Sequence, residues 1–109
     1  MITDDEIEKT LSWLVKNATP AAEARGTRHY MDEYRKSLKA MLMKKSGEET
    51  AAAQEREALA SPDYIKHLEA LRFAVVEDER FRWLTVAAEA KIEVWRSEQA
   101  NQRAQGRVQ

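Results

Sequence analysis

The histidine and carboxylate side chains of His29, Asp32 and Glu33 have the spacing of a metal site on a helix. Residues three and four positions apart share one helix face, so these groups could approach a single ion. No further ligand is in view beside them, and a solvated helix face explains the same pattern. The sequence therefore favours the interpretation that no metal is bound here.

Other side chains that could do chemistry lack the partners that catalysis needs. Ser61 stands directly before Pro62, and no known motif places a His or Lys beside it, so we interpret it as a helix cap. The carboxylates of Glu77, Asp78 and Glu79 fall on different sides of a helix and do not converge. The chain has no Cys and no Gly-rich phosphate loop. The sequence predicts a protein that is not an enzyme and has no cofactor.

The element that must position any functional residue is one long helix from Pro62 to about Gln105. Ser61 is a suitable N-cap, Pro62 suits the first helical position, and no further Pro or Gly occurs before Gly106. Such a helix would be roughly 65 Å long, which is too long for a compact globule of 109 residues.

Placing successive residues of this helix 100° apart separates two apolar stripes. The first runs its whole length: Tyr64, Ile65, Leu68, Leu71, Val75, Val76, Trp83, Val86, Ala87, Ala90 and Val94. The second lies roughly opposite, in the C-terminal half only: Phe81, Leu84, Ala88, Ile92 and Trp95. We expect the first stripe to pack within the chain and the second to form an interface in a homo-oligomer.

The rest of the chain predicts three further helices, at about 4–17, 20–45 and 48–60, with a flexible tail at 106–109. Thr3 to Glu6 form a capping box, Thr19-Pro20 should end the first helix, and Ser46-Gly47-Glu48-Glu49 form a second capping box. A seam in the second helix should pack on the long one: Met31, Tyr34, Leu38 and Leu42. The predicted fold is a single all-α domain, an elongated helical hairpin or bundle with antiparallel coiled-coil-like packing.

Basic residues are unevenly distributed, although the net charge is only −1. The segment from Arg25 to Lys45 carries seven basic residues against Asp32 and Glu33, and the C-terminal end adds more. Two interpretations stay open, a solvated outer face or a surface for an anionic partner. The candidate nucleic-acid-binding residues are Arg25, Arg28, Arg35, Lys36, Lys39, Arg96 and Arg103.

Composition limits the cellular setting. Charged residues make up 34% of the chain, and the lack of Cys fits a reducing compartment. The acidic, polar start MITDDEIEKT is unlike a signal peptide, and no run approaches the ~20 apolar residues of a membrane span. We expect a cytoplasmic protein that does not interact with membranes.

The C-terminal half resembles small all-helical proteins of phage and prophage recombination gene clusters. The likeness rests on Glu55-Arg56-Glu57-Ala58, on Ser61-Pro62 with Tyr64, on Arg82-Trp83, and on Ile92 with Trp95-Arg96. More distantly, the layout of a basic middle helix and a long helix with a basic end is similar to the UvsY-type recombination mediators. This resemblance implies an oligomer that binds single-stranded DNA in the host cytoplasm and assists a recombinase, an annealing protein or a single-strand-binding protein.

Two function classes therefore remain. One is a phage-type recombination accessory protein that binds single-stranded DNA as an oligomer. The other is a non-enzymatic helical adaptor or inhibitor that binds a protein partner and no nucleic acid.

Overall fold

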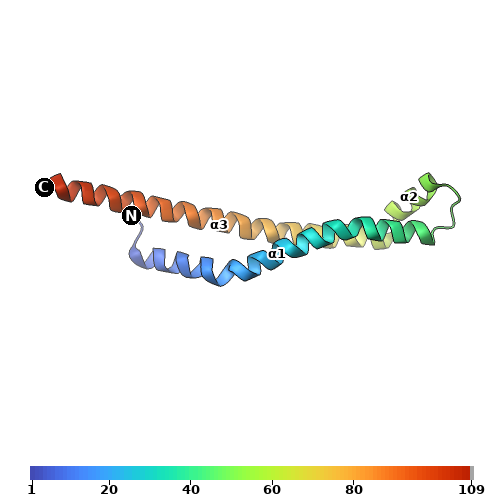
Figure 1. Cartoon of the computed structure of the whole chain (residues 1–109), viewed down its shortest axis with the longest axis horizontal. Coiled ribbons are helices and arrows are strands. Elements are labelled where there is room, and N and C mark those ends of the chain that lie inside the picture. Colours follow the sequence, from blue (N-terminus) through green and yellow to red (C-terminus); the bar gives the residue numbers. More distant parts are fainter. Residues whose placement is uncertain (109) are drawn as a thin grey trace. The chain divides into compact units, whose positions relative to one another are not determined.

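The computed structural model describes residues 1–108, which form three α-helices and no strand. They are α1 (Asp4–Lys45), α2 (Ala51–Ala60) and α3 (Pro62–Val108), as Figure 1 shows. The prediction of an all-α protein with one long C-terminal helix is confirmed. The sequence predicts a single domain, but the chain divides into two compact units. We call Met1–Ala22 together with the residues from Arg80 onward the terminal unit, and Glu23–Glu79 the middle unit.

α1 is a single helix of 42 residues, so the predicted helix end near Asn17 is wrong. Pro20 lies inside α1 and cannot donate a backbone hydrogen bond to the preceding turn, which typically costs about 3 kcal/mol in a helix interior. The Ala residues around it favour helix, and helical residues on both sides pack against α3. Packing along α1 therefore outweighs the local penalty at the proline.

The capping box at the start of α1 is present as predicted. The backbone N–H of Glu6 donates to Thr3 Oγ1 at 3.1 Å, and the backbone N–H of Thr3 donates to Glu6 Oε2 at 2.8 Å. Each side chain thus satisfies one backbone N–H that would otherwise lack a partner at the helix start.

The second predicted capping box does not form, and α2 begins at Ala51 instead of about residue 48. Ser46 Oγ donates to Glu57 Oε2 at 2.6 Å and accepts from the backbone N–H of Glu48, so it does not cap a helix. Thr50 takes that role, because its side chain accepts a hydrogen bond from the backbone N–H of Ala53. The chain reverses direction between α1 and α2, as Figure 1 shows.

Only Ser61 separates α2 from α3. Its backbone N–H donates to the Ala58 carbonyl, which ends α2, and its carbonyl accepts from the backbone N–H of Ile65, which starts α3. α3 then continues through Val108, so Gly106 and Arg107 are helical and the predicted flexible tail from residue 106 is wrong for them. Gln109, the last residue of that predicted tail, lies outside the described residues.

Within each unit, α1 and α3 run antiparallel and meet along residues spaced alternately three and four apart. We call these the inner positions, and all of them are buried or half-buried. In the terminal unit they are Ile7, Thr10, Leu14, Asn17 and Ala21 of α1, with Phe81, Thr85, Ala88, Ile92, Trp95 and Gln99 of α3. In the middle unit they are Ala24, Arg28, Met31, Arg35, Leu38 and Leu42 of α1, with Tyr64, His67, Leu71, Ala74 and Asp78 of α3. This spacing is the heptad pattern of a coiled coil.

The inner positions of α3 correct the predicted roles of its two stripes. Phe81 is buried within the chain, whereas Trp83 of the supposed packing stripe is 60% exposed. An ideal helix of 3.6 residues per turn drifts about 20° per heptad from a 3.5-residue repeat. Between Tyr64 and Trp95, more than four heptads, the drift amounts to about 90°. A projection at 100° per residue therefore follows the inner face at the start of α3 and leaves it further along.

Paired substitutions of two phenylalanines test this assignment. Phe81→Ala should lower the free energy of unfolding by about 3 kcal/mol, because a ring that is 8% exposed leaves a cavity when removed. Phe73→Ala makes the same chemical change at a ring that is 72% exposed and should cost less than about 0.5 kcal/mol. Urea unfolding followed by circular dichroism in dilute solution measures both.

The reverse order, with Phe73→Ala the more damaging, would show that Phe81 does not lie on the inner face of α3. Dilution matters because association would stabilise the folded chain and obscure the comparison.

Candidate functional site

Most of the predicted nucleic-acid-binding residues are already paired with carboxylates of the same chain. In the middle unit, Arg28 contacts Asp78 at 3.1 Å and Glu79 at 3.0 Å, and Lys39 contacts Glu55 at 2.6 Å. The hydrogen bonds that the Arg28 guanidinium donates, first to Glu79 and then to Asp78, hold the pKa of Arg28 above its ordinary value. These two cations neutralise the chain's own acids.

The remaining predicted cations differ in how available they are. Three of them contact an acid one turn away: Arg35 with Asp32, Lys36 with Glu33, and Arg96 with Glu93. Exposed pairs of this kind are weak, so they would yield to a stronger anion. Arg35 also has a buried Nε with no hydrogen-bond partner among the described residues. Of the seven predicted cations, only Arg25 and Arg103 are exposed and make no ion pair within the described residues.

Charge in the middle unit is balanced once all of its helices are counted. Glu23–Glu79 contains ten basic and twelve acidic residues. The excess of basic residues in Arg25–Lys45 is thus compensated by acids of α2 and α3, which lie far away in the sequence. The middle unit as a whole therefore carries a slight acidic excess.

The three residues with metal-ligand spacing do not form a site. Asp32 and Glu33 are engaged with Arg35 and Lys36, as described above, and His29 is exposed. No group of three or more metal-ligating side chains converges within residues 1–108. The solvated face that the sequence favours fits these ion pairs.

The residues predicted to join subunits mostly face the chain's own α1. Phe81, Ala88, Ile92 and Trp95 occupy inner positions of the terminal unit. The indole Nε1 of Trp95 donates to Asp4 Oδ1 at 3.2 Å, so this ring contacts the start of α1. Leu84 is the exception, because 42% of it is exposed. The second stripe therefore has a partner within the chain.

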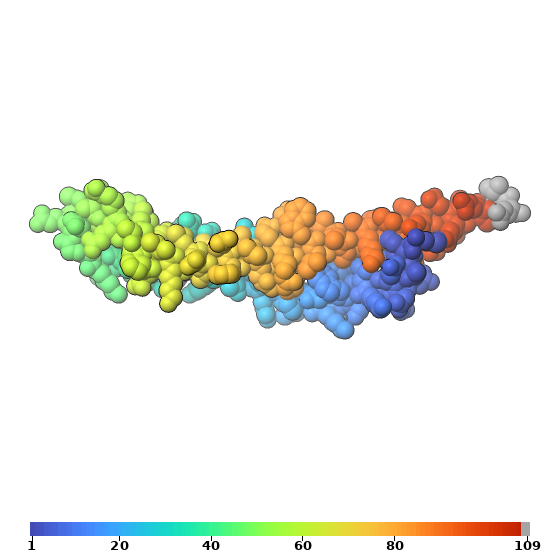
Figure 2. Space-filling view, turned by 180° about the vertical axis from the view of Figure 1, so that it is seen from behind, coloured from blue at the N-terminus to red at the C-terminus, as the bar shows by residue number. Residues whose placement is uncertain are grey.

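A different set of apolar residues on α3 is left uncovered by the other described elements. It recurs at steps of three, four and seven residues on the side of the helix away from the inner positions, and Figure 2 shows this helix from yellow to orange on an uncovered face. We call it the outer stripe, and its members are Phe73, Val76, Trp83, Ala87, Ala90 and Val94, all exposed. Between Phe73 and Val94, the same alternation of three- and four-residue steps includes one charged residue, Arg80, which lies between Val76 and Trp83.

The first predicted stripe, which was expected to pack within the chain, contains every residue of the outer stripe except Phe73. Phe73 was absent from both predicted stripes. Counting 3.5 residues per turn from Tyr64 would have separated the two faces, because the inner and outer residues then follow two heptad patterns on opposite sides of one helix. A period of 3.5 residues applies only when two helices wind around each other, so the packing of α1 on α3 was needed to select it.

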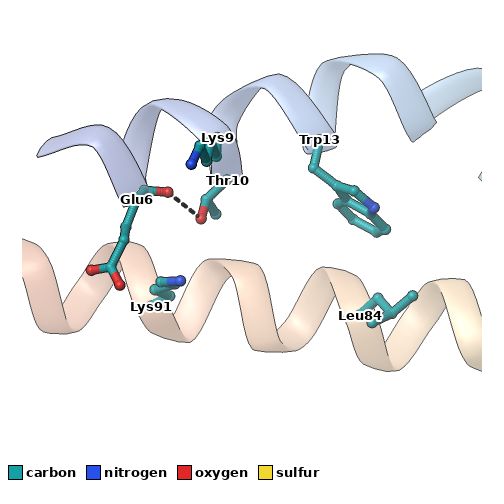
Figure 3. A pocket seen from close by; sticks show the side chains of 6 residues that line it. All are labelled: Glu6, Lys9, Thr10, Trp13, Leu84 and Lys91. Carbon is teal, nitrogen blue, oxygen red and sulfur yellow. Dashed lines mark hydrogen bonds between the residues drawn. The ribbon is translucent and has the colours of Figure 1, made fainter. Parts of the chain in front are cut away.

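A shallow groove of about 300 Å³ lies between α1 and α3 in the terminal unit. Its lining residues are Glu6, Lys9, Thr10, Trp13, Leu84 and Lys91. Figure 3 shows the Trp13 ring extending from α1 toward α3, with the Glu6 carboxylate reaching toward Lys91 at the other end. The groove has an apolar end at Trp13 and Leu84 and a charged end at Glu6 and Lys91. No catalytic pair of side chains converges in it.

The Glu6 carboxylate has a pKa below its ordinary value. The main cause is the hydrogen bond from the Thr3 backbone, and Lys91 adds a smaller favourable charge interaction. Both interactions favour the ionised form. The groove therefore presents a carboxylate that serves the fold as a cap.

None of the described helices combines the length and the apolar character that crossing a bilayer requires. Comparison with protein-family models finds no match, and comparisons with curated proteins and with solved structures find no significant match. The likeness to phage recombination proteins therefore stays a prediction from the residues alone.

Acid should destabilise the start of α1 through Glu6. A carboxyl group with a depressed pKa in the folded state stabilises the fold above its ordinary value of 4.5, and this stabilisation is lost as the pH falls through the lower, folded-state value. Glu6→Gln keeps an acceptor for Thr3 but cannot titrate, so its thermal midpoint should fall less than that of the original chain below pH 4.5.

Glu8→Gln is the matched control, because Glu8 is exposed and makes no hydrogen bond or ion pair within residues 1–108. Thermal unfolding by circular dichroism across the acid range measures all three proteins. Identical curves for the two variants would show that the Thr3–Glu6 pair contributes nothing to the acid response.

Proposed function

We propose that this protein is a non-enzymatic interaction protein that binds a helix of a protein partner through the outer stripe of α3. The observation that supports it is the exposure of large apolar side chains along one face of a continuous helix, with Phe73 at 72% and Trp83 at 60%. Contiguous apolar surface of this kind on a soluble protein generally marks a binding surface.

The spacing of the outer stripe indicates the kind of partner. Steps of three, four and seven residues form a seam that a second amphipathic helix can fill with its own apolar residues. Covering a large apolar side chain completely is worth about 1.5–3 kcal/mol, so four such side chains on the outer stripe supply enough free energy to offset the cost of association.

Photo-crosslinking tests this proposal even though the partner is unidentified. Trp83→p-benzoylphenylalanine in the full chain, irradiated in the cells that produce it natively, should give a protein adduct of defined mass. The reason is that a docked helix would lie against residue 83. The same replacement at Glu89, also exposed on α3 but outside the outer stripe, is the control.

Adducts at Trp83 and none at Glu89 would support the outer stripe as the binding surface. Equal adducts at both positions, or none at either, would overturn the proposal.

Single-stranded DNA binding by a phage-type recombination accessory protein is the second candidate. It is supported by exposed cations that make no ion pair within residues 1–108, among them Arg25, Lys44, Lys45 and Arg103, and by the resemblance described above. Against it stands the acidic balance of the middle unit, because phosphate binding needs a net positive surface.

The salt dependence of binding distinguishes this candidate from the first. If the chain binds DNA, a labelled single-stranded oligonucleotide should show affinity that falls steeply with salt, by a slope of about −0.7 per phosphate contact. Arg25→Glu combined with Arg103→Glu should then weaken binding and make the slope shallower, as measured by fluorescence anisotropy. Lys36→Glu is the control variant, because Lys36 is already paired with Glu33. No salt-dependent binding by the original chain would rule this candidate out.

A further inference from the structure

We infer that the partner of the outer stripe is a second copy of this chain, with two α3 helices packed antiparallel around a twofold axis. This inference rests on the proposed function, because it names the occupant of the same surface. The outer stripe extends from Phe73 to Val94, about three heptads on one helix. Its order of large and small side chains makes it complementary to itself.

Large residues dominate the first part of the outer stripe, and alanines follow in the second. When two copies are aligned antiparallel so that Phe73 of one faces Ala90 of the other, Val76 of the first copy faces Ala87 of the second. Both contacts occur twice because of the twofold symmetry. Phe73 and Val76 thus each meet an alanine, which is how facing layers of a coiled coil interdigitate. The same alignment places Trp83 opposite Arg80 of the second copy.

Charge favours the same arrangement. The antiparallel alignment brings Arg72, which flanks the outer stripe, close to Glu93 of the second copy, and this contact also occurs twice. Glu93 contacts Arg96 of its own helix at 2.9 Å in an exposed pair, so a second cation can share it. A parallel dimer would instead place Arg80 beside Arg80 of the second copy and Phe73 against Phe73. Repulsion between like charges and crowding of rings both disfavour that alternative.

The area of the outer stripe indicates how tightly two copies would bind. A fully covered aromatic side chain buries about 150–250 Å². Since Phe73 and Trp83 are 72% and 60% exposed, the four rings of a dimer would contribute on the order of 500 Å². A specific interface needs about 1,200 Å² or more, and the valines, the alanines and the flanking stems must supply the difference. The interface lies at the small end of this range, so association should depend on concentration in the micromolar range.

Sedimentation velocity with matched valine substitutions tests the inference on the full chain. The original chain should sediment as a dimer at high micromolar concentration and as a monomer on dilution. Val76→Asp places a charge in the outer stripe and should weaken dimerisation by at least about 100-fold, because the charge would be buried without a partner. Val15→Asp makes the same change at an exposed valine of α1 outside the outer stripe and should leave the dimer intact.

Mixing two variants tests the alignment itself. Val76→Lys and Ala87→Asp should each weaken the dimer when alone, since each forms two unfavourable contacts. An equimolar mixture should recover a heterodimer, because in the antiparallel alignment the new lysine of one chain faces the new aspartate of the other. Circular dichroism of each variant in dilute solution verifies that the helices are retained.

Three outcomes would overturn the inference. A monomer at every concentration would exclude the second copy. A dimer unaffected by Val76→Asp would place the interface elsewhere. Failure of the mixed variants to pair, with each alone monomeric, would exclude the antiparallel alignment. A monomeric chain whose residue 83 still crosslinks to a different protein would overturn this inference and leave the proposed function standing, so the two can fail separately.

Discussion

The ion pairs from Arg28 to Asp78 and Glu79 join α1 to α3 in the middle unit and constrain how the two helices align there. Arg28 and Asp78 both occupy inner positions, where a coiled coil normally places apolar side chains. A charged residue at such a position finds its partner only in one alignment of the two helices. Sliding α1 by one turn would separate the half-buried Arg28 guanidinium from both carboxylates. The pairs therefore select the register of α1 against α3 there. His67 adds a second polar constraint, since its Nε2 donates to the Met31 carbonyl at 2.7 Å.

This use of polar and small residues leaves a thin core. The only buried hydrophobic residues among the described ones are Ile7, Ala24, Ala58, Tyr64, Ala74 and Phe81, and three of them are alanines. Two helices cannot cover each other on more than one face, so every apolar residue elsewhere on α3 remains in contact with water. The outer stripe follows directly from this geometry. Burial of these exposed side chains by another helix would add hydrophobic stabilisation that the chain's own helices do not supply.

The same antiparallel packing decides the electrostatics. Acids of α2 and α3 lie beside the basic residues of α1, so Lys39 contacts Glu55 and Arg28 contacts Asp78 and Glu79. A segment that is strongly basic along the sequence thereby becomes part of a unit with a slight acidic excess. Linear charge runs predict an anionic ligand only where folding does not bring compensating charges alongside.

The sequence by itself determined that the chain is helical, where α3 starts, and that a capping box begins α1, because caps and backbone propensities act within a few residues. It also determined most of the α1 seam that packs on α3. Met31, Leu38 and Leu42 lie close together in the sequence, so the angular error from a wrong helical period stays small across them. Only the tertiary structure decided that helix continues through Pro20, that Phe81 and Trp95 face inward, and that Phe73 and Trp83 face outward. Those outcomes depend on contacts between segments far apart in the sequence and on an angular drift that accumulates over several heptads, and neither can be read from local residue patterns.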